Sequence, residues 1–238
     1  MHRGLRFFPQ IILAAAALVF FVSVDVISSG VAANEEIIEF SAETIEQVLN
    51  RDPVLGKLYV AKDKIRIEML VDEKRRIMIR DFSSRKTLHL NPTTKEYMEV
   101  PWPAAKSNRI HATVKRPPLP GDVDHHCAKF DQVKCKMLSK EEKIDNRKTE
   151  KWEIIQVIEP NKQSNETRTI RSLVWVDRQL GVNVREEMFF DVNSKSLKEL
   201  RGIKEGVQPK VLFQVPMGYR RVEMPQPKSR DGNVKPMK

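Results

Sequence analysis

The sequence has little of what catalytic and nucleotide-binding sites are made from. Only nine of its 238 residues are glycine, which leaves little material for a loop that holds a phosphate through backbone N–H groups. It has no GxSxG elbow, no P-loop, no glycine-rich dinucleotide turn and no HExxH motif. Its five histidines are dispersed except for the adjacent pair His125 and His126. Since no nucleophile, base and oxyanion donor come together, we predict that the protein is not an enzyme and uses no cofactor.

Cysteine is equally scarce. Cys127 and Cys135 are separated by the short segment AKFDQVK, and in an oxidising compartment such a pair most often forms a structural disulfide. The alternative is a metal site, because Asp122, Asp124 and His125 lie close by in DVDHHC. Zinc-binding cysteines are usually two to four residues apart, so the separation of eight fits no common zinc pattern. We therefore predict a disulfide and no metal.

The sequence has no hydrophobic run of the length that a membrane-spanning helix normally needs. Residues 11–24 are apolar, but Asp25 follows them, and a spanning helix needs about 20 apolar residues. A basic start with Arg3 and Arg6, this run, and the small residues of VAA at 31–33 are typical of a signal peptide. We predict cleavage after Ala33, which gives a periplasmic or secreted protein. A retained anchor is the alternative, and a lipid-anchored lipoprotein is not expected because no cysteine lies near the cut.

A basic charge remains after that cleavage. Removing residues 1–33 takes away two basic residues and one acidic residue, so the mature chain keeps a formal charge of +9. The charges are dispersed, without the arginine-rich aromatic platform that single-stranded nucleic acid requires. We expect a solvated surface with attraction to an anionic membrane as the secondary interpretation, and no nucleic-acid partner.

Alternating apolar residues and turn signals recur along the rest of the chain at the spacing of short antiparallel strands. Connections such as AKDK and NPTTK are too short for a parallel crossover. The predicted strands are Ile38–Leu49, Gly56–Ala61, Lys64–Val71, Arg76–Phe82, Thr87–Asn91, Glu96–Val100, Lys134–Lys140, Glu150–Ile158, Thr169–Asp177, Asn183–Val192, Leu197–Lys204 and Val211–Val215.

Two segments break this pattern. Residues 101–124 are rich in proline, which excludes a regular strand or a long helix, although a short helix over 104–114 fits within them. We interpret this insert as either a linker between two halves or a flap over one end of the sheet. Residues 224–238 have the composition of a disordered basic tail. The domain organisation is thus a signal peptide at 1–33, one β domain at 34–223 and a tail.

The alternation also predicts burial. In residues 182–192, Val182, Val184, Met188 and Phe190 are expected on a buried face with Val192, and Asn183, Arg185 and Glu187 on a wet one. The adjacent acids Glu186 and Glu187 then point to opposite faces and cannot share a proton. SLVWVD at 172–177 is apolar on both sides, so both sides must be covered.

A sheet with one apolar face and few helices to cover it must curl. We predict a mainly β fold, a single curled antiparallel sheet that forms an incomplete barrel, with few short helices. A barrel that stays partly open leaves an apolar cleft.

Particular strings resemble a known family. GKLYVAKDKIRIEM, LVWVDRQLGVNVREE and VLFQVPMGYRRVEM are similar to the strand series of the LolA/LolB-like periplasmic lipoprotein-sorting superfamily, above all to its secreted relatives of unknown function. The similar positions are Lys64, Arg66 and Glu68; Trp175, Val176, Asp177, Leu180 and Gly181; and Phe213, Val215, Pro216, Gly218 and Tyr219. The resemblance implies an incomplete barrel with a helical lid around a cavity for acyl chains. This sequence differs in its proline-rich insert, its cysteine pair and its scarcity of helical lid segments.

Two functional hypotheses follow. The first is an exported binding protein of the bacterial envelope that holds a lipid or an acylated protein in an apolar cleft. The candidate lining residues are Ile65, Ile67, Met69, Ile77, Ile79, Leu88, Leu90 and Trp175. These residues alternatively form an ordinary packed core. The second hypothesis is a structural or regulatory envelope protein that binds a protein partner through a sheet edge or its basic surface, as related stress sensors do.

Overall fold

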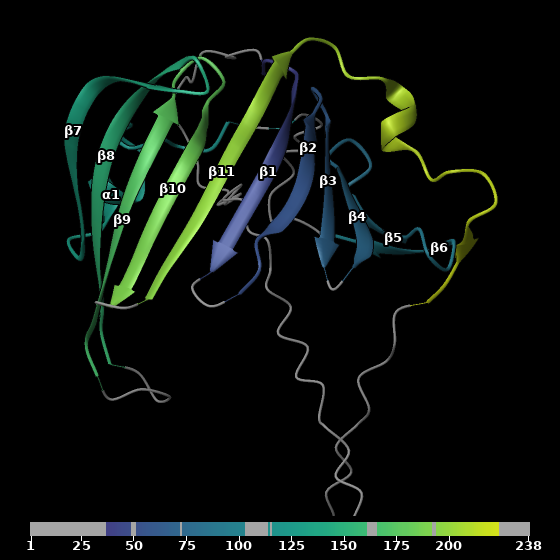
Figure 1. The fold of residues 1–238 in the computed structure, drawn as a ribbon, viewed down its shortest axis with the longest axis horizontal. Coiled ribbons are helices and arrows are strands. Elements are labelled where there is room, and N and C mark those ends of the chain that lie inside the picture. The colour runs from purple at the N-terminus through teal and green to yellow at the C-terminus, as the bar shows by residue number, and fades with distance from the viewer. Residues whose placement is uncertain are drawn as a thin grey trace, which may run out of the picture.

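Short hairpin connections build the architecture. The computed structural model describes residues 37–48, 51–71, 73–102, 114, 116–160, 166–191 and 194–223. In this part of the chain, one sheet of 12 strands curves from β7 at one edge to β6 and β12 at the other (Figure 1). The strands are β1 (Phe40–Val48), β2 (Val54–Val60), β3 (Lys64–Val71), β4 (Lys74–Asp81), β5 (Lys86–Asn91), β6 (Glu96–Pro101), β7 (Val133–Ile144), β8 (Arg147–Ile158), β9 (Arg168–Asp177), β10 (Val182–Asp191), β11 (Ser194–Glu205) and β12 (Arg220–Arg221).

The fold class predicted from the sequence is confirmed. β1 to β6 form one antiparallel series and β7 to β11 another, and the two are joined by antiparallel pairing of β1 with β11. The two edges do not pair with each other in the described sheet, so the barrel is incomplete. Helix is restricted to α1 (His126–Lys129) and the 3-10 turn η1 (Lys210–Phe213) among the described residues.

Local chemistry explains one of the tight hairpins. β7 and β8 are joined by Asp145 and Asn146, which both have positive φ values of 50° and 62°. Such a two-residue turn matches the twist of the flanking strands, and Asp and Asn tolerate the left-handed backbone better than most residues. β7 is also an edge strand, and its lysines and register shifts at Met137/Ser139 and Ser139/Glu142 discourage pairing with another chain.

Each face of the sheet carries a cluster of buried apolar side chains. On the inner face, which faces the cavity described below, Phe40, Leu58, Ile65, Ile67 and Leu200 belong to one buried cluster. On the outer face, a second cluster is formed by Ala61, Ile77, Ile79, Leu88, Leu90 and Phe213. This second cluster is buried because the segment around η1 packs over β3 to β5.

The predicted strand Val211–Val215 is therefore wrong. Residues 210–213 form η1 instead, flanked by Pro209 and Pro216, which have no N–H to donate to a ladder. Phe213 packs into the outer cluster, and the Arg66 guanidinium donates a 2.6 Å hydrogen bond to the carbonyl oxygen of Leu212. The apolar alternation of this segment thus serves packing onto the sheet. The parallel two-residue pairing of β12 with β6 is a further feature that the sequence did not predict.

The predictions for the ends and the insert are only partly within the described residues. The signal peptide at 1–33 and the tail at 224–238 lie outside them, as does the helix over 104–114 except for Val114. Val114 is buried, and its N–H donates to the carbonyl oxygen of Lys62. In the described part of the chain no helix is long and apolar enough to cross a membrane.

Candidate functional site

The inner face of the sheet encloses a cavity of about 540 Å³, a size within the roughly 300–1,000 Å³ range of small-molecule sites. One apolar wall comes from β1, β2, β3 and β11, strands that lie side by side in the sheet, and further apolar side chains of β7 to β10 also line the cavity. The residues of this wall are Phe40, Leu58, Val60, Ile65, Ile67 and Leu200. Six large side chains from both series of strands thus face one space, so the cavity depends on the pairing of β1 with β11.

The side of the cavity opposite the sheet is formed by residues 116–130, which we call the strap. Pro117, Pro118, Leu119 and Pro120 line the cavity from the strap, together with Phe130 and polar residues of α1 and its approach. Prolines suit this position because they have no backbone N–H that would need a partner there. The described residues 116–124 of the insert thus lie over the inner face of the sheet, and its interpretation as a flap stays a prediction.

The strap approaches the sheet closely at Gly181. This residue has a φ of 72°, and a Cβ atom built on it would lie 2.7 Å from the Cγ and Cδ atoms of Arg116. Only glycine combines that backbone conformation with that contact distance. The glycine of the LG turn therefore lets the strap lie directly against the end of β9 and β10.

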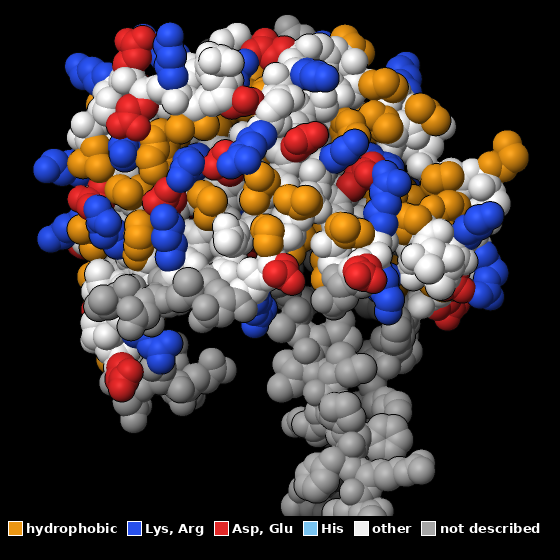
Figure 2. Space-filling view, in the orientation of Figure 1, with side chains coloured by type: hydrophobic (Ala, Val, Ile, Leu, Met, Phe, Trp, Pro, Cys, Tyr) orange, Lys and Arg blue, Asp and Glu red, His pale blue; other side chains and the backbone are white. Residues whose placement is uncertain are grey.

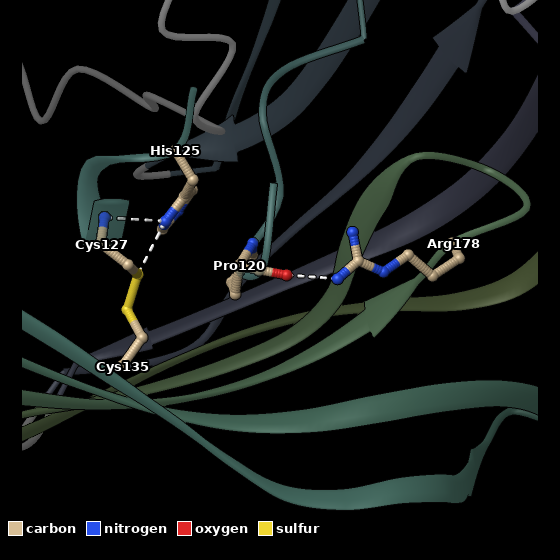
Figure 3. The surroundings of a disulfide bond; sticks show 5 residues. All are labelled: Pro120, His125, Cys127, Cys135 and Arg178. Atoms are coloured by element: carbon tan, nitrogen blue, oxygen red, sulfur yellow. Dashed lines mark hydrogen bonds between the residues drawn. A yellow bond between two sulfur atoms is a disulfide. The ribbon is translucent and has the colours of Figure 1, made fainter. Parts of the chain in front are cut away.

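Two links hold the strap to the sheet (Figure 3). The Arg178 guanidinium donates to the Pro120 carbonyl oxygen, to Asp122 Oδ1 at 2.8 Å and to Glu150 Oε2 at 2.9 Å. Cys127 of α1 is paired with Cys135 of β7, with a Cα–Cα distance of 5.6 Å, which is within the usual range for disulfides. The Arg178 contacts lie on both sides of Gly121, and the cysteine pair lies further along the strap.

His125 lies beside the cysteine pair. Its Nδ1 accepts a hydrogen bond from the Cys127 N–H and is 2.7 Å from Cys127 Sγ. Burial, followed by the positive field of His126, lowers the pKa of His125 and favours the neutral imidazole. The donor atoms of His125, Cys127 and Cys135 lie within 4.8 Å of one another. As long as the two sulfurs are bonded to each other, neither is a thiolate, and the group has no metal-binding chemistry.

One polar part of the cavity lies on β10 and β11. Glu186 of β10 and Lys198 of β11 are directly opposite each other, and both line the cavity. Burial raises the pKa of Glu186, and the attraction of Lys198 only partly offsets this. Lys198 is also 3.9 Å from Glu46. Next to them, Asn183 Oδ1 is buried and has no hydrogen-bond partner among the described residues.

The eight predicted lining residues divide between the two faces. Ile65 and Ile67 line the cavity, whereas Met69 packs at the margin of the inner cluster. Ile77, Ile79, Leu88 and Leu90 lie on the outer face under Phe213 and do not line it. Ile79 is opposite Arg66 across β3 and β4, while its neighbour Met78 is opposite Ile67. The predicted residues alternate correctly within each strand, but the register between β3 and β4 places Ile77 and Ile79 on the face opposite to Ile65 and Ile67.

Trp175 is also on the outer face. Its indole Nε1 donates a 2.7 Å hydrogen bond to Glu142, and Lys151 and Arg185 lie 4.7 and 5.3 Å from its ring centroid. Val174, on the other side of the strand, packs against Leu119 of the strap. The prediction that both sides of this strand are covered is confirmed, but Trp175 does not reach the cavity.

In β10 the predicted division of faces is only partly confirmed. Glu186 and Glu187 do point to opposite faces, since Glu187 makes ion pairs with Arg185 and Lys195 while Glu186 lines the cavity. Asn183, predicted on the wet face, also lines the cavity, because the register shifts between Asn183 and Arg185. Phe190, predicted on the buried face, lies at a second register shift and is 44% exposed.

The sequence interpretation missed the strap, the polar cavity residues Arg80, Glu186 and Lys198, and four residues of the apolar wall, which are Phe40, Leu58, Val60 and Leu200. Strand parity alone places Glu186 with Met188, so its position could have been found. No comparable signal existed for the strap, because nothing in a proline-rich segment says which surface it covers.

Comparisons with known proteins concern the fold. No family model and no curated protein matches the sequence. Solved structures that are similar include an uncharacterised conserved protein from Thermus thermophilus, with a TM-score of 0.47 and 9% identity over 79% of this chain and 91% of that one. A complex of MucA and MucB from Pseudomonas aeruginosa gives a TM-score of 0.47 and 11% identity over 75% of this chain and 56% of the matched chain.

A LolA superfamily protein from Nitrosomonas europaea is also among them, with a TM-score of 0.30 and 8% identity over 76% of this chain and 91% of that one. The fold that the sequence strings implied, a curled and unclosed antiparallel sheet, is the fold of the described residues.

Proposed function

We propose that this protein is exported to the bacterial envelope and, without catalysing a reaction, holds a lipid or the acyl chain of a lipoprotein in the cavity between the sheet and the strap. The observation that supports this most is the apolar wall of six residues facing an enclosed space of about 540 Å³. An acyl chain placed there is removed from water at about 25 cal/mol per Å² of apolar surface. The signal peptide with cleavage after Ala33 belongs to the same proposal.

The outer face of the sheet carries many charged side chains (Figure 2), unlike the apolar wall of the cavity. Figure 2 shows basic and acidic side chains interspersed over the strands on that face, with apolar groups between them. A mixed charged surface keeps the protein soluble and offers only a weak general attraction to anionic membranes. The cavity is therefore the favoured place for a lipid.

The test is displacement of a fluorescent fatty acid from protein that begins at Asn34 and has its cysteines oxidised. We expect saturable binding of one probe per chain, displaced by unlabelled acyl compounds, and co-purifying lipid in native mass spectra of protein from the envelope fraction. Folded protein that binds no acyl probe of any head group would contradict the proposal.

A second candidate function is the binding of a protein partner. The segment after β11 exposes apolar side chains, with Val207 87%, Val211 70% and Met217 101% exposed. Crosslinking in the envelope that captures a specific protein through this segment, together with a clean apo mass, would favour this candidate over lipid binding.

A further inference from the structure

One cationic side chain in the cavity differs from the others. Arg80 lies on β4 directly opposite Ile65 of β3, and both residues line the cavity. Its neighbour Ile79 faces the outer cluster, which places Arg80 on the inner face by strand parity. A guanidinium group thus stands at the margin of the apolar wall.

Arg80 has no carboxylate partner among the described residues. Its one recorded interaction is with an aromatic face, the Cζ atom lying 5.8 Å from the ring centroid of Trp102. Other half-buried or buried arginines of the described sheet do meet acids: Arg66 pairs with Glu68, Arg147 with Asp177 and Arg185 with Glu199. Burial alone lowers the pKa of Arg80, and no nearby acid opposes this.

The other lysine and arginine residues around the cavity either lie near a carboxylate or are exposed to solvent. Lys198 is opposite Glu186 and lies 3.9 Å from Glu46. Arg116 is 3.7 Å from Asp122, and Lys129 is exposed on α1. A partly desolvated charge without a counter-charge is unfavourable in the empty protein. It becomes favourable when an anion occupies the space in front of it.

We propose that Arg80 binds the head group of an anionic amphiphile, a carboxylate or a phosphate monoester, whose acyl chain lies along the wall of Leu58, Ile67 and Leu200. This rests on the proposed function and names its ligand class. The planar guanidinium donates two parallel hydrogen bonds to either anion. Trp102 supports the plane of the guanidinium through a cation–π contact and leaves its N–H groups free for the ligand.

The test compares laurate, lauryl phosphate and dodecanol, which share one chain and differ in head group, in the displacement assay. For the native protein we expect laurate or lauryl phosphate to bind at least about tenfold more tightly than dodecanol, as a hydrogen-bonded ion pair would give. Which of the two binds more tightly distinguishes a carboxylate from a phosphate ligand. Inorganic phosphate alone should not displace the probe, and displacement by it would overturn the assignment to an amphiphile.

Arg80→Met should lower the affinity for the charged ligands to that for dodecanol and leave the affinity for dodecanol unchanged. Arg76→Met is the matched control, because Arg76 is on the same strand with the same parity but is exposed and outside the cavity. If Arg80→Met fails to fold, Arg80→Lys keeps the charge without the fork and should retain part of the preference for laurate.

The outcomes separate the two proposals. Equal affinity of the native protein for laurate, lauryl phosphate and dodecanol, or an equal loss for all three in Arg80→Met, overturns the role of Arg80 while acyl binding stands. Failure of all three ligands, dodecanol included, overturns the proposed function itself.

Discussion

The guanidinium of Arg178, the residue directly after β9, donates to the carbonyl oxygen of Pro120 in the strap, and the same group donates to Asp122 and Glu150. A single side chain thus joins the sheet to the segment that covers the cavity. Since the guanidinium is about one third exposed, its ion pairs are screened and the contribution to stability is modest.

Arg178→Met should therefore loosen the strap more than it destabilises the protein. We expect a loss of about 1–2 kcal/mol in the free energy of unfolding, and a faster release of bound acyl probe in stopped-flow displacement. Arg171→Met is the control, because Arg171 lies on β9 and makes an exposed ion pair with Glu153 of β8, away from the strap. An unchanged release rate in Arg178→Met would show that the strap does not limit ligand exchange.

The Cys127–Cys135 pair closes a loop with a sequence separation of 8. Replacing both cysteines by serine should cost about 2.5 kcal/mol, the chain-entropy value for so short a loop. Unfolding curves with and without reductant give the measurement, and reductant should reproduce the loss in the native protein but have no effect on the double variant. Two titratable thiols in the unfolded, unreduced native protein would show that the disulfide does not form.

Ile67 and Ile79 provide a matched pair, because both are buried isoleucines on adjacent strands and face opposite sides of the sheet. Ile67→Gln should weaken acyl-chain binding about tenfold and cost about 1 kcal/mol, because a cavity wall leaves room to hydrate an amide. Ile79→Gln should cost about 3 kcal/mol or more and leave binding unchanged, because its amide is enclosed by the outer cluster. The same large loss of stability in both variants, with no acyl binding by the native protein, would mean that the inner face is an ordinary core.

Glu186 gives a prediction for pH. Burial raises its pKa above the ordinary value of 4.5, so the folded protein holds this proton more tightly than the unfolded chain does. Its stabilising contribution is complete below the unfolded pKa and is lost as the pH rises through the raised pKa of the folded state. Glu186→Gln should therefore raise Tm at neutral pH and leave it nearly unchanged at about pH 4.

Thermal melts of both proteins across this pH range provide the measurement. Glu68 and Glu187, whose pKa values are lowered despite burial by their arginine and lysine partners, act in the opposite direction and are present in both proteins. They cancel from the difference between the two Tm values. A difference that does not change with pH would contradict the raised pKa of Glu186.

The strands were predictable because alternation and short turns are local signals. The bounds of Lys64–Val71 agree with the structure, and most other strands differ by one to three residues at an end. The face of the sheet to which each strand turns its apolar side chains was harder to predict from the sequence. Ile67 and Ile77 both alternate correctly within their strands, but the register that sends them to opposite sides is fixed by their pairing partners, Met78 and Glu68.

The site was predictable only in part for a related reason. The spacing of Cys127 and Cys135 was enough to predict a disulfide, with which their Cα–Cα distance of 5.6 Å is compatible. The position of the strap, in contrast, depends on tertiary contacts from Arg178 and Gly181. Arg80 carries no signal at all in sequence, because an arginine beside isoleucines in a strand is ordinarily a solvated residue. Its distinction is the missing counter-charge, which is a property of the folded neighbourhood.

The pairing of β1 with β11 brings Phe40 opposite Glu205, so the centre of the sheet is made from the two ends of the strand series. During synthesis or export the six N-terminal strands must wait, with the edge of β1 unpaired, until the last long strand has emerged. Contacts so distant along the chain form slowly, and a waiting strand edge is a template for association with other chains. Folding of this protein is therefore exposed to aggregation at one defined stage, and a ligand or a chaperone that acts before residue 194 is available meets a sheet without its completed cavity.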